Sequence, residues 1–117
     1  MAAARSGIIT EEMKAVAAKE YRTEEEIRDL VARGQVAICA NKLHKCLDPN
    51  GIGSMLRTKI NVNLGVSRDC KDYDIEMKKV MAAVDMGAEA IMDLSSHGDT
   101  QPFRRKLTAE CPAMIGT

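Results

Sequence analysis

Two asparagines, Asn61 and Asn63, lie two residues apart in the short apolar segment KINVNLG, Lys59–Gly65. They alternate with apolar residues, which is the pattern of a β-strand with one apolar and one polar face; the apolar residues are Ile60, Val62 and Leu64. An amide donates and accepts hydrogen bonds at once, which suits a polar ligand such as an imidazole or a ribose phosphate. Burying an amide without partners costs about 1–3 kcal/mol, so the segment predicts either a ligand-binding face or a hydrogen-bonded pair between strands.

A second polar segment, IMDLSSHGD, spans residues 91–99 and predicts a strand followed by a loop. Asp93 shares one strand face with Ile91, and Met92 lies on the other. Asp93 could serve in acid–base chemistry or could anchor a backbone amide, and Met92 could contact a ligand or belong to a core. The loop could bind an anion through its backbone N–H groups. His97 in this loop could be an acid, a base, a ligand or an ordinary surface histidine.

The four cysteines, Cys39, Cys46, Cys70 and Cys111, include no C-x-x-C pair. His44 lies between the first two, but the usual spacing of a zinc site is absent. We therefore expect four reduced thiols, most of them small core residues.

The N-terminal third predicts two helices that precede these candidate residues. Thr10 can cap the first helix, and Thr23 with Glu26 forms the capping box of the second. We expect a short strand and then a turn-rich loop to follow, over residues 35–40 and 41–54.

Strands and helices alternate in the remaining half of the chain. We expect strands over residues 58–65, 89–95 and 111–117, with one helix over 74–87 and another that Thr100 caps. This β-α-β-α-β order is typical of a parallel sheet with right-handed crossovers, in a doubly wound fold or a (β/α)8 barrel. In both folds the chemistry lies at the C-terminal ends of the strands, where the two polar segments fall.

The two helices of this half predict the inward-facing side chains. The first carries an apolar stripe at helical spacing, formed by Met77, Val80, Met81 and Val84. In the second, Phe103 and Leu107 face inward, and Arg104 is expected in the solvated part.

Composition excludes several classes of protein. The 117 residues carry 17 basic and 17 acidic side chains, so no electrostatic footprint favours nucleic acid or a membrane surface. No apolar run approaches the ~20 residues of a membrane span, and residues 1–20 lack the apolar core of a signal peptide. We therefore expect a cytoplasmic protein.

Several long blocks resemble the phosphomethylpyrimidine synthase (ThiC) family, in its order and at its spacing, from about residue 7 to the end. The blocks are GIITEEMKAVAAKE, EEIRDLVARGQVAICANKLH, GIGSMLRTKINVNLGVS, GAEAIMDLSSHGD and IGT. The resemblance implies a radical S-adenosylmethionine enzyme with a (β/α)8 barrel and a [4Fe-4S] cluster. Such enzymes rearrange aminoimidazole ribonucleotide to the hydroxymethylpyrimidine phosphate of thiamine.

The resemblance also implies which residues bind the substrate. Asn63 matches the second asparagine of the N-x-N-[IL]-G motif, Met92 matches the methionine of M-D-L-S, and Asn61 becomes a support residue. No catalytic residue is assigned. The family's cluster motif, C-x2-C-x4-C, and the histidines for an additional metal ion lie beyond residue 117, so no metal ligand is assigned in this chain. We expect the intact enzyme to be a homodimer, as many barrel enzymes are.

Some positions depart from the family's usual pattern. CANKLH stands for PANINH, NVNLG for NANIG, SSHGD for STGGD, and CPAMIGT for PVPVGT. These changes resemble a paralogous branch that converts the same substrate into 5-hydroxybenzimidazole for anaerobically made cobamides. A further alternative is a truncated, non-catalytic copy that binds a nucleotide or another subunit.

The chain is short for the fold that it predicts. A full (β/α)8 barrel needs about 250 residues, so we expect a fragment that is inactive alone. We expect residues 1–54 to form an N-terminal helical segment with a short strand and a loop, and residues 55–117 to form the first β/α units of an incomplete barrel.

Overall fold

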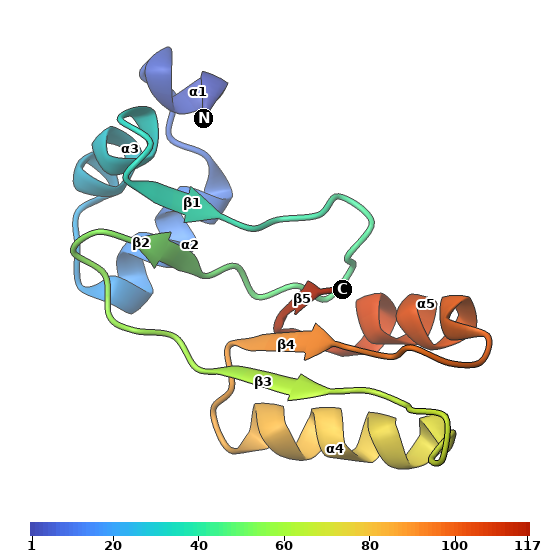
Figure 1. Ribbon diagram of the computed structural model, residues 1–117. Helices are drawn as coiled ribbons and strands as arrows, with labels where there is room; N and C mark the ends of the chain where they lie inside the picture. The colour runs from blue at the N-terminus through green and yellow to red at the C-terminus, as the bar shows by residue number, and fades with distance from the viewer. The chain divides into compact units, whose positions relative to one another are not determined.

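The computed structural model describes residues 1–117 and contains five helices and five short strands (Figure 1). The helices are α1 (Ala2–Arg5), α2 (Glu11–Glu20), α3 (Glu24–Ala32), α4 (Tyr73–Asp85) and α5 (Thr100–Glu110), and the strands are β1 (Val36–Ile38), β2 (Gly51–Gly53), β3 (Asn61–Leu64), β4 (Ala90–Asp93) and β5 (Met114–Gly116). None of these helices has the length and apolar composition that crossing a membrane requires. The chain divides into two units, residues 1–40 with 49–58 and residues 41–48 with 59–117.

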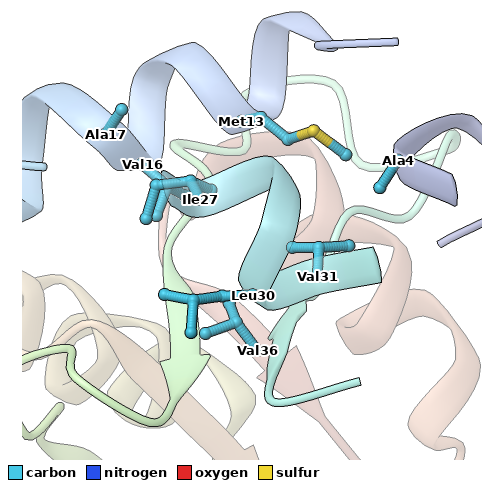
Figure 2. Close-up of a cluster of buried hydrophobic side chains, with 8 residues drawn as sticks. All are labelled: Ala4, Met13, Val16, Ala17, Ile27, Leu30, Val31 and Val36. Carbon is cyan, nitrogen blue, oxygen red and sulfur yellow. The ribbon is translucent and has the colours of Figure 1, made fainter. Parts of the chain in front are cut away.

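The first unit packs its helices around one apolar cluster (Figure 2). The Oγ1 atom of Thr10 accepts a hydrogen bond from the N–H of Met13 at the start of α2. Thr23 and Glu26 form the reciprocal capping box of α3. Both caps confirm the sequence prediction. The helices thereby direct their apolar faces into a core of Ala4, Met13, Val16, Ala17, Ile27, Leu30, Val31 and Val36.

A second strand in this unit corrects the predicted loop over residues 41–54. Residues Gly51–Gly53 pair antiparallel with β1, with Val36 opposite Gly53. Two of the three residues of β2 are glycines, so no side-chain alternation marks the strand in the sequence. The short helix α1 was likewise not predicted.

The second unit is a three-stranded parallel sheet in the order β3-β4-β5. Helices α4 and α5 connect the strands (Figure 1). Their apolar side chains share one core with Ile91 of β4, and Val62 and Leu64 of β3 and Ile115 of β5 pack against it. The predicted mixed α/β architecture with a parallel sheet is therefore confirmed.

Three details of the second unit differ from the prediction. Met81 is 37% exposed, and Ala83 of the same helix is buried instead, so the inward face of α4 is rotated from the predicted stripe. Ile60 is 61% exposed because it precedes β3 and does not share its core face. Asp99, rather than Thr100, caps α5, and its carboxylate accepts the N–H of Gln101 at 3.3 Å.

Candidate functional site

A row of three residues crosses the sheet near the C-terminal ends of its strands. Asn63 of β3 lies opposite Met92 of β4, and Met92 lies opposite Gly116 of β5. Paired residues of neighbouring parallel strands point to the same face of a sheet, and the strands lie about 4.8 Å apart. The structure thus brings together two of the side chains that the sequence singles out, although they are far apart along the chain.

The row lies on the face of the sheet opposite to the core of the second unit. Val62 and Leu64 pack against that core, whereas Asn61 and Asn63 alternate with them and are exposed. In β4 the alternation is the same: Ile91 is fully buried, and Met92 is half-buried. The predicted assignment of the two faces is confirmed for both strands.

The two asparagines bind one another within the same strand, not across strands. The Nδ2 atom of Asn61 donates a hydrogen bond of 2.8 Å to the Oδ1 atom of Asn63. The bond to the Oδ1 atom favours one orientation of the Asn63 amide, in which its Nδ2 group can donate to a ligand. Asn61 therefore orients Asn63.

Met92 lies over a glycine of the neighbouring strand. A Cβ atom added to Gly116 would lie 2.8 Å from the Cε atom and 2.9 Å from the Sδ atom of Met92. A side chain at this position would displace the flexible end of Met92, so Gly116 leaves room for the thioether where it lies. The row therefore combines an amide donor with a polarisable apolar surface.

Asp93 lies on the core face and anchors backbone and helix together. Its Oδ1 atom accepts the N–H of Ser95 at 3.0 Å, and its Oδ2 atom pairs with the Nε atom of Arg104 at 2.8 Å. Burial acts to raise the pKa of Asp93, but the hydrogen bonds from Ser95 and Arg104 outweigh it and hold the pKa below its ordinary value. The side chain of Arg104 is partly exposed, as expected, but its guanidinium also compensates a buried carboxylate, an interaction that was not predicted.

Glu76 is a buried carboxylate that sequence reasoning missed. It lies in α4 with 1% of its surface exposed, and its Oε2 atom accepts the N–H of Gly65 at 3.0 Å. Its other oxygen forms an ion pair with Lys79. Its principal partner is a backbone amide eleven residues away, so no spacing pattern distinguishes it from the exposed glutamates of the other helices.

The loop after β4 contains His97, which does not join the row. Its Nδ1 atom shares a hydrogen bond of 2.9 Å with the Oγ atom of Ser96, and its backbone carbonyl accepts the hydroxyl of Tyr73 at 3.0 Å. The imidazole is exposed. The structure thus places His97 at the surface beside the candidate site.

The cysteines do not form a ligand set. Cys111 is buried, but Cys39 and Cys70 are exposed, so the expectation that most of them are core residues is wrong. The thiol of Cys46 and the Nε2 atom of His44 both donate to the carbonyl oxygen of Cys111. Residues 1–117 contain no group of three or more His, Cys, Asp or Glu side chains that could hold a metal ion. The residues present therefore do not fit an iron–sulfur cluster.

Open parallel α/β sheets bind their ligands at the C-terminal ends of the strands, which is where this row lies. The chain belongs to the Radical SAM ThiC family, whose model matches residues 1–117. It is 59% identical to a phosphomethylpyrimidine synthase of Clostridioides difficile (strain 630), 61% to one of Alkaliphilus oremlandii (strain OhILAs) and 57% to one of Clostridium botulinum (strain Hall). Each comparison covers 100% of this chain and 27% of the relative's length. The predicted family resemblance is confirmed over the whole chain.

Proposed function

We propose that this chain supplies part of the substrate pocket of a phosphomethylpyrimidine synthase, a radical enzyme of the carbon–carbon lyase type. The substrate is aminoimidazole ribonucleotide, and the product is the hydroxymethylpyrimidine phosphate of thiamine biosynthesis. The family match and the names of the three relatives support the reaction. The observation that carries the proposal is the register pairing of Asn63 with Met92 on one exposed face.

The two side chains suit complementary parts of an aminoimidazole. The Nδ2 group of Asn63 donates to a ring nitrogen or to an oxygen of the ribose phosphate. The thioether of Met92 packs against the aromatic ring, since sulfur–aromatic contacts are favourable. Asn61 acts as support, because its hydrogen bond fixes the amide of Asn63. Together they bind and orient the substrate.

The three parallel strands are proposed to be strands of a (β/α)8 barrel, with residues 55–117 as its first β/α units and residues 1–54 before them. In such a barrel the row lies at the catalytic end. We propose that the intact enzyme is a cytoplasmic homodimer and that the 117 residues alone do not turn over substrate.

Radical S-adenosylmethionine families use a [4Fe-4S] cluster and S-adenosylmethionine, and we propose that residues other than the four cysteines of this chain hold the cluster and the additional metal ion. Such a cluster, when bound, would supply one-electron reduction of S-adenosylmethionine. The residues of this chain hold the imidazole ribonucleotide in place for that chemistry.

Anaerobic turnover by the full-length gene product tests the proposal. The reaction contains aminoimidazole ribonucleotide, S-adenosylmethionine and a reductant, and mass spectrometry identifies the product. We expect hydroxymethylpyrimidine phosphate together with 5′-deoxyadenosine. Formation of 5-hydroxybenzimidazole would assign the chain to the paralogous branch instead. No consumption of the substrate would exclude both reactions and favour a non-catalytic binding module.

A further inference from the structure

Two buried carboxylates each hold a backbone N–H group at the C-terminal end of a strand. Glu76 of α4 binds the N–H of Gly65, and Asp93 of β4 binds the N–H of Ser95, each at 3.0 Å. Both residues are 1% exposed. A charged acceptor makes a hydrogen bond roughly twice as strong as a neutral one, so these two amides are held firmly.

Each carboxylate also has one basic partner that compensates its charge. Lys79 pairs with Glu76 one turn along α4, and Arg104 of α5 pairs with Asp93. The side chains of Lys79 and Arg104 are 53% and 38% exposed. The helices on the core face therefore bind the loops at the end of the sheet through buried, charged contacts.

The two loops held in this way are also joined to each other. The N–H of Val66 donates to the Oγ atom of Ser95, and the N–H of Ser96 donates to the carbonyl oxygen of Val66, both at 3.1 Å. A Cβ atom on Gly65 would lie 2.5 Å from the backbone nitrogen of Ser95. The loops after β3 and β4 are therefore held against each other by hydrogen bonds and by close packing of their backbones.

We propose that Glu76 and Asp93 are positioning residues for the substrate site. Glu76 fixes the backbone two residues after Asn63, and Asp93 is the immediate neighbour of Met92. The carboxylates thereby keep the two side chains in the row in which they meet the substrate, without contacting the substrate themselves. The inference rests on the proposed function of Asn63 and Met92.

The test separates positioning from stability through a double-mutant cycle in the full-length gene product. The variants are Glu76→Ala, Asn63→Ala and the combination of both, and isothermal titration calorimetry measures the Kd for aminoimidazole ribonucleotide. We expect Glu76→Ala to weaken binding about tenfold. The combined variant is expected to bind as weakly as Asn63→Ala, because residues that act through one another are not additive.

Further variants serve as controls, as a fallback and as a repeat of the cycle. Glu76→Gln keeps an oxygen that accepts the N–H of Gly65, so we expect its Kd to stay within about threefold of the unsubstituted protein. Lys78→Met changes an exposed lysine of the same helix that is not the ion-pair partner of Glu76, and we expect an unchanged Kd. If Glu76→Ala does not fold, Glu76→Asp carries the same cycle, because it keeps the charge but shortens its reach. Asp93→Ala combined with Met92→Ala repeats the cycle on β4.

The outcomes distinguish this inference from the proposed function. If the effects of Glu76→Ala and Asn63→Ala simply add, or if folded Glu76→Ala binds normally, Glu76 does not act through Asn63 and the inference is overturned. If Asn63→Ala itself leaves the Kd unchanged, Asn63 is not a substrate contact and the proposed function of the row fails. Circular dichroism and iron content show that each variant is folded and carries its cluster.

Discussion

The Nδ2 atom of Asn61 donates to the Oδ1 atom of Asn63 across 2.8 Å, on the exposed face of β3. The bond gives the two amides unequal roles, although they belong to the same motif and are exposed alike. Asn61 uses one N–H of its amide in the bond to its neighbour. The Nδ2 group of Asn63 remains available as a donor, and the bond orients it.

This asymmetry predicts unequal effects of two alanine substitutions. Asn63→Ala removes the donor itself and should raise the Kd of the full-length gene product for aminoimidazole ribonucleotide by roughly 10–100-fold. Asn61→Ala removes only the bond that orients it and should raise the Kd by about threefold. Calorimetric titration of both variants checks the order, and a larger effect at Asn61 would reverse the assigned roles.

Gly65 predicts a large loss of stability on substitution. Its φ is +143°, and a Cβ atom would lie 2.5 Å from the backbone nitrogen of Ser95. Gly65→Ala should therefore lower the free energy of unfolding by about 2–4 kcal/mol. Gly87 is the matched control, because its φ is +95° but nothing lies within 4 Å of the added atom. Gly87→Ala should lower the free energy of unfolding by about 1–2 kcal/mol, and urea denaturation measures both variants. Equal losses at the two positions would show that the close approach of Gly65 to Ser95 is unimportant.

The ion pair of Asp93 predicts a specific dependence of stability on pH. The pKa of Asp93 is lowered from 3.8, so its ionised form is favoured in the folded state. The stabilisation is therefore complete above pH 3.8 and is lost as the pH falls through the lowered value. Asp93→Asn should be less stable by roughly 1–3 kcal/mol at neutral pH, and this difference should shrink only in acid. Urea denaturation of the apoprotein over a range of pH measures it, and a difference that shrinks between about pH 8 and 6 would contradict the assignment.

The cysteines are expected to differ in reactivity. Burial raises the pKa of the Cys111 thiol, whereas Cys39 and Cys70 are exposed. The thiolate is the nucleophile, so iodoacetamide at about pH 8 should modify Cys111 at least about tenfold more slowly than the exposed pair. Peptide mass spectrometry over time gives the three rates. Rapid modification of Cys111 in folded protein would show that its environment opens readily.

Local chemistry is what the sequence predicts well in this protein. The cap at Thr10, the capping box at Thr23 and the alternating faces of β3 each depend on residues within one turn or one strand. The interactions of Glu76 and Arg104 were not predictable in this way, because each depends on a partner that the fold brings from another element.

The register of the sheet lies between these two cases. The β-α-β order predicts that Asn63 and Met92 lie at the same edge. It does not predict that they are direct partners, since a shift of two residues keeps every side chain on its face. That pairing follows from the structure alone.

The sheet of the second unit has two different edge strands, β3 and β5, because each pairs with a neighbour on one side only. Because the strands are parallel, the β5 edge of one molecule can pair with the β3 edge of another. The pair that forms still has one free β3 edge and one free β5 edge, so further molecules can add. Produced by itself, the 117-residue polypeptide should therefore associate head to tail into a series of oligomers of increasing size and not stop at a closed dimer. Sedimentation velocity at rising concentration would reveal these oligomers, and a single monomeric boundary would show that the edge strands are protected.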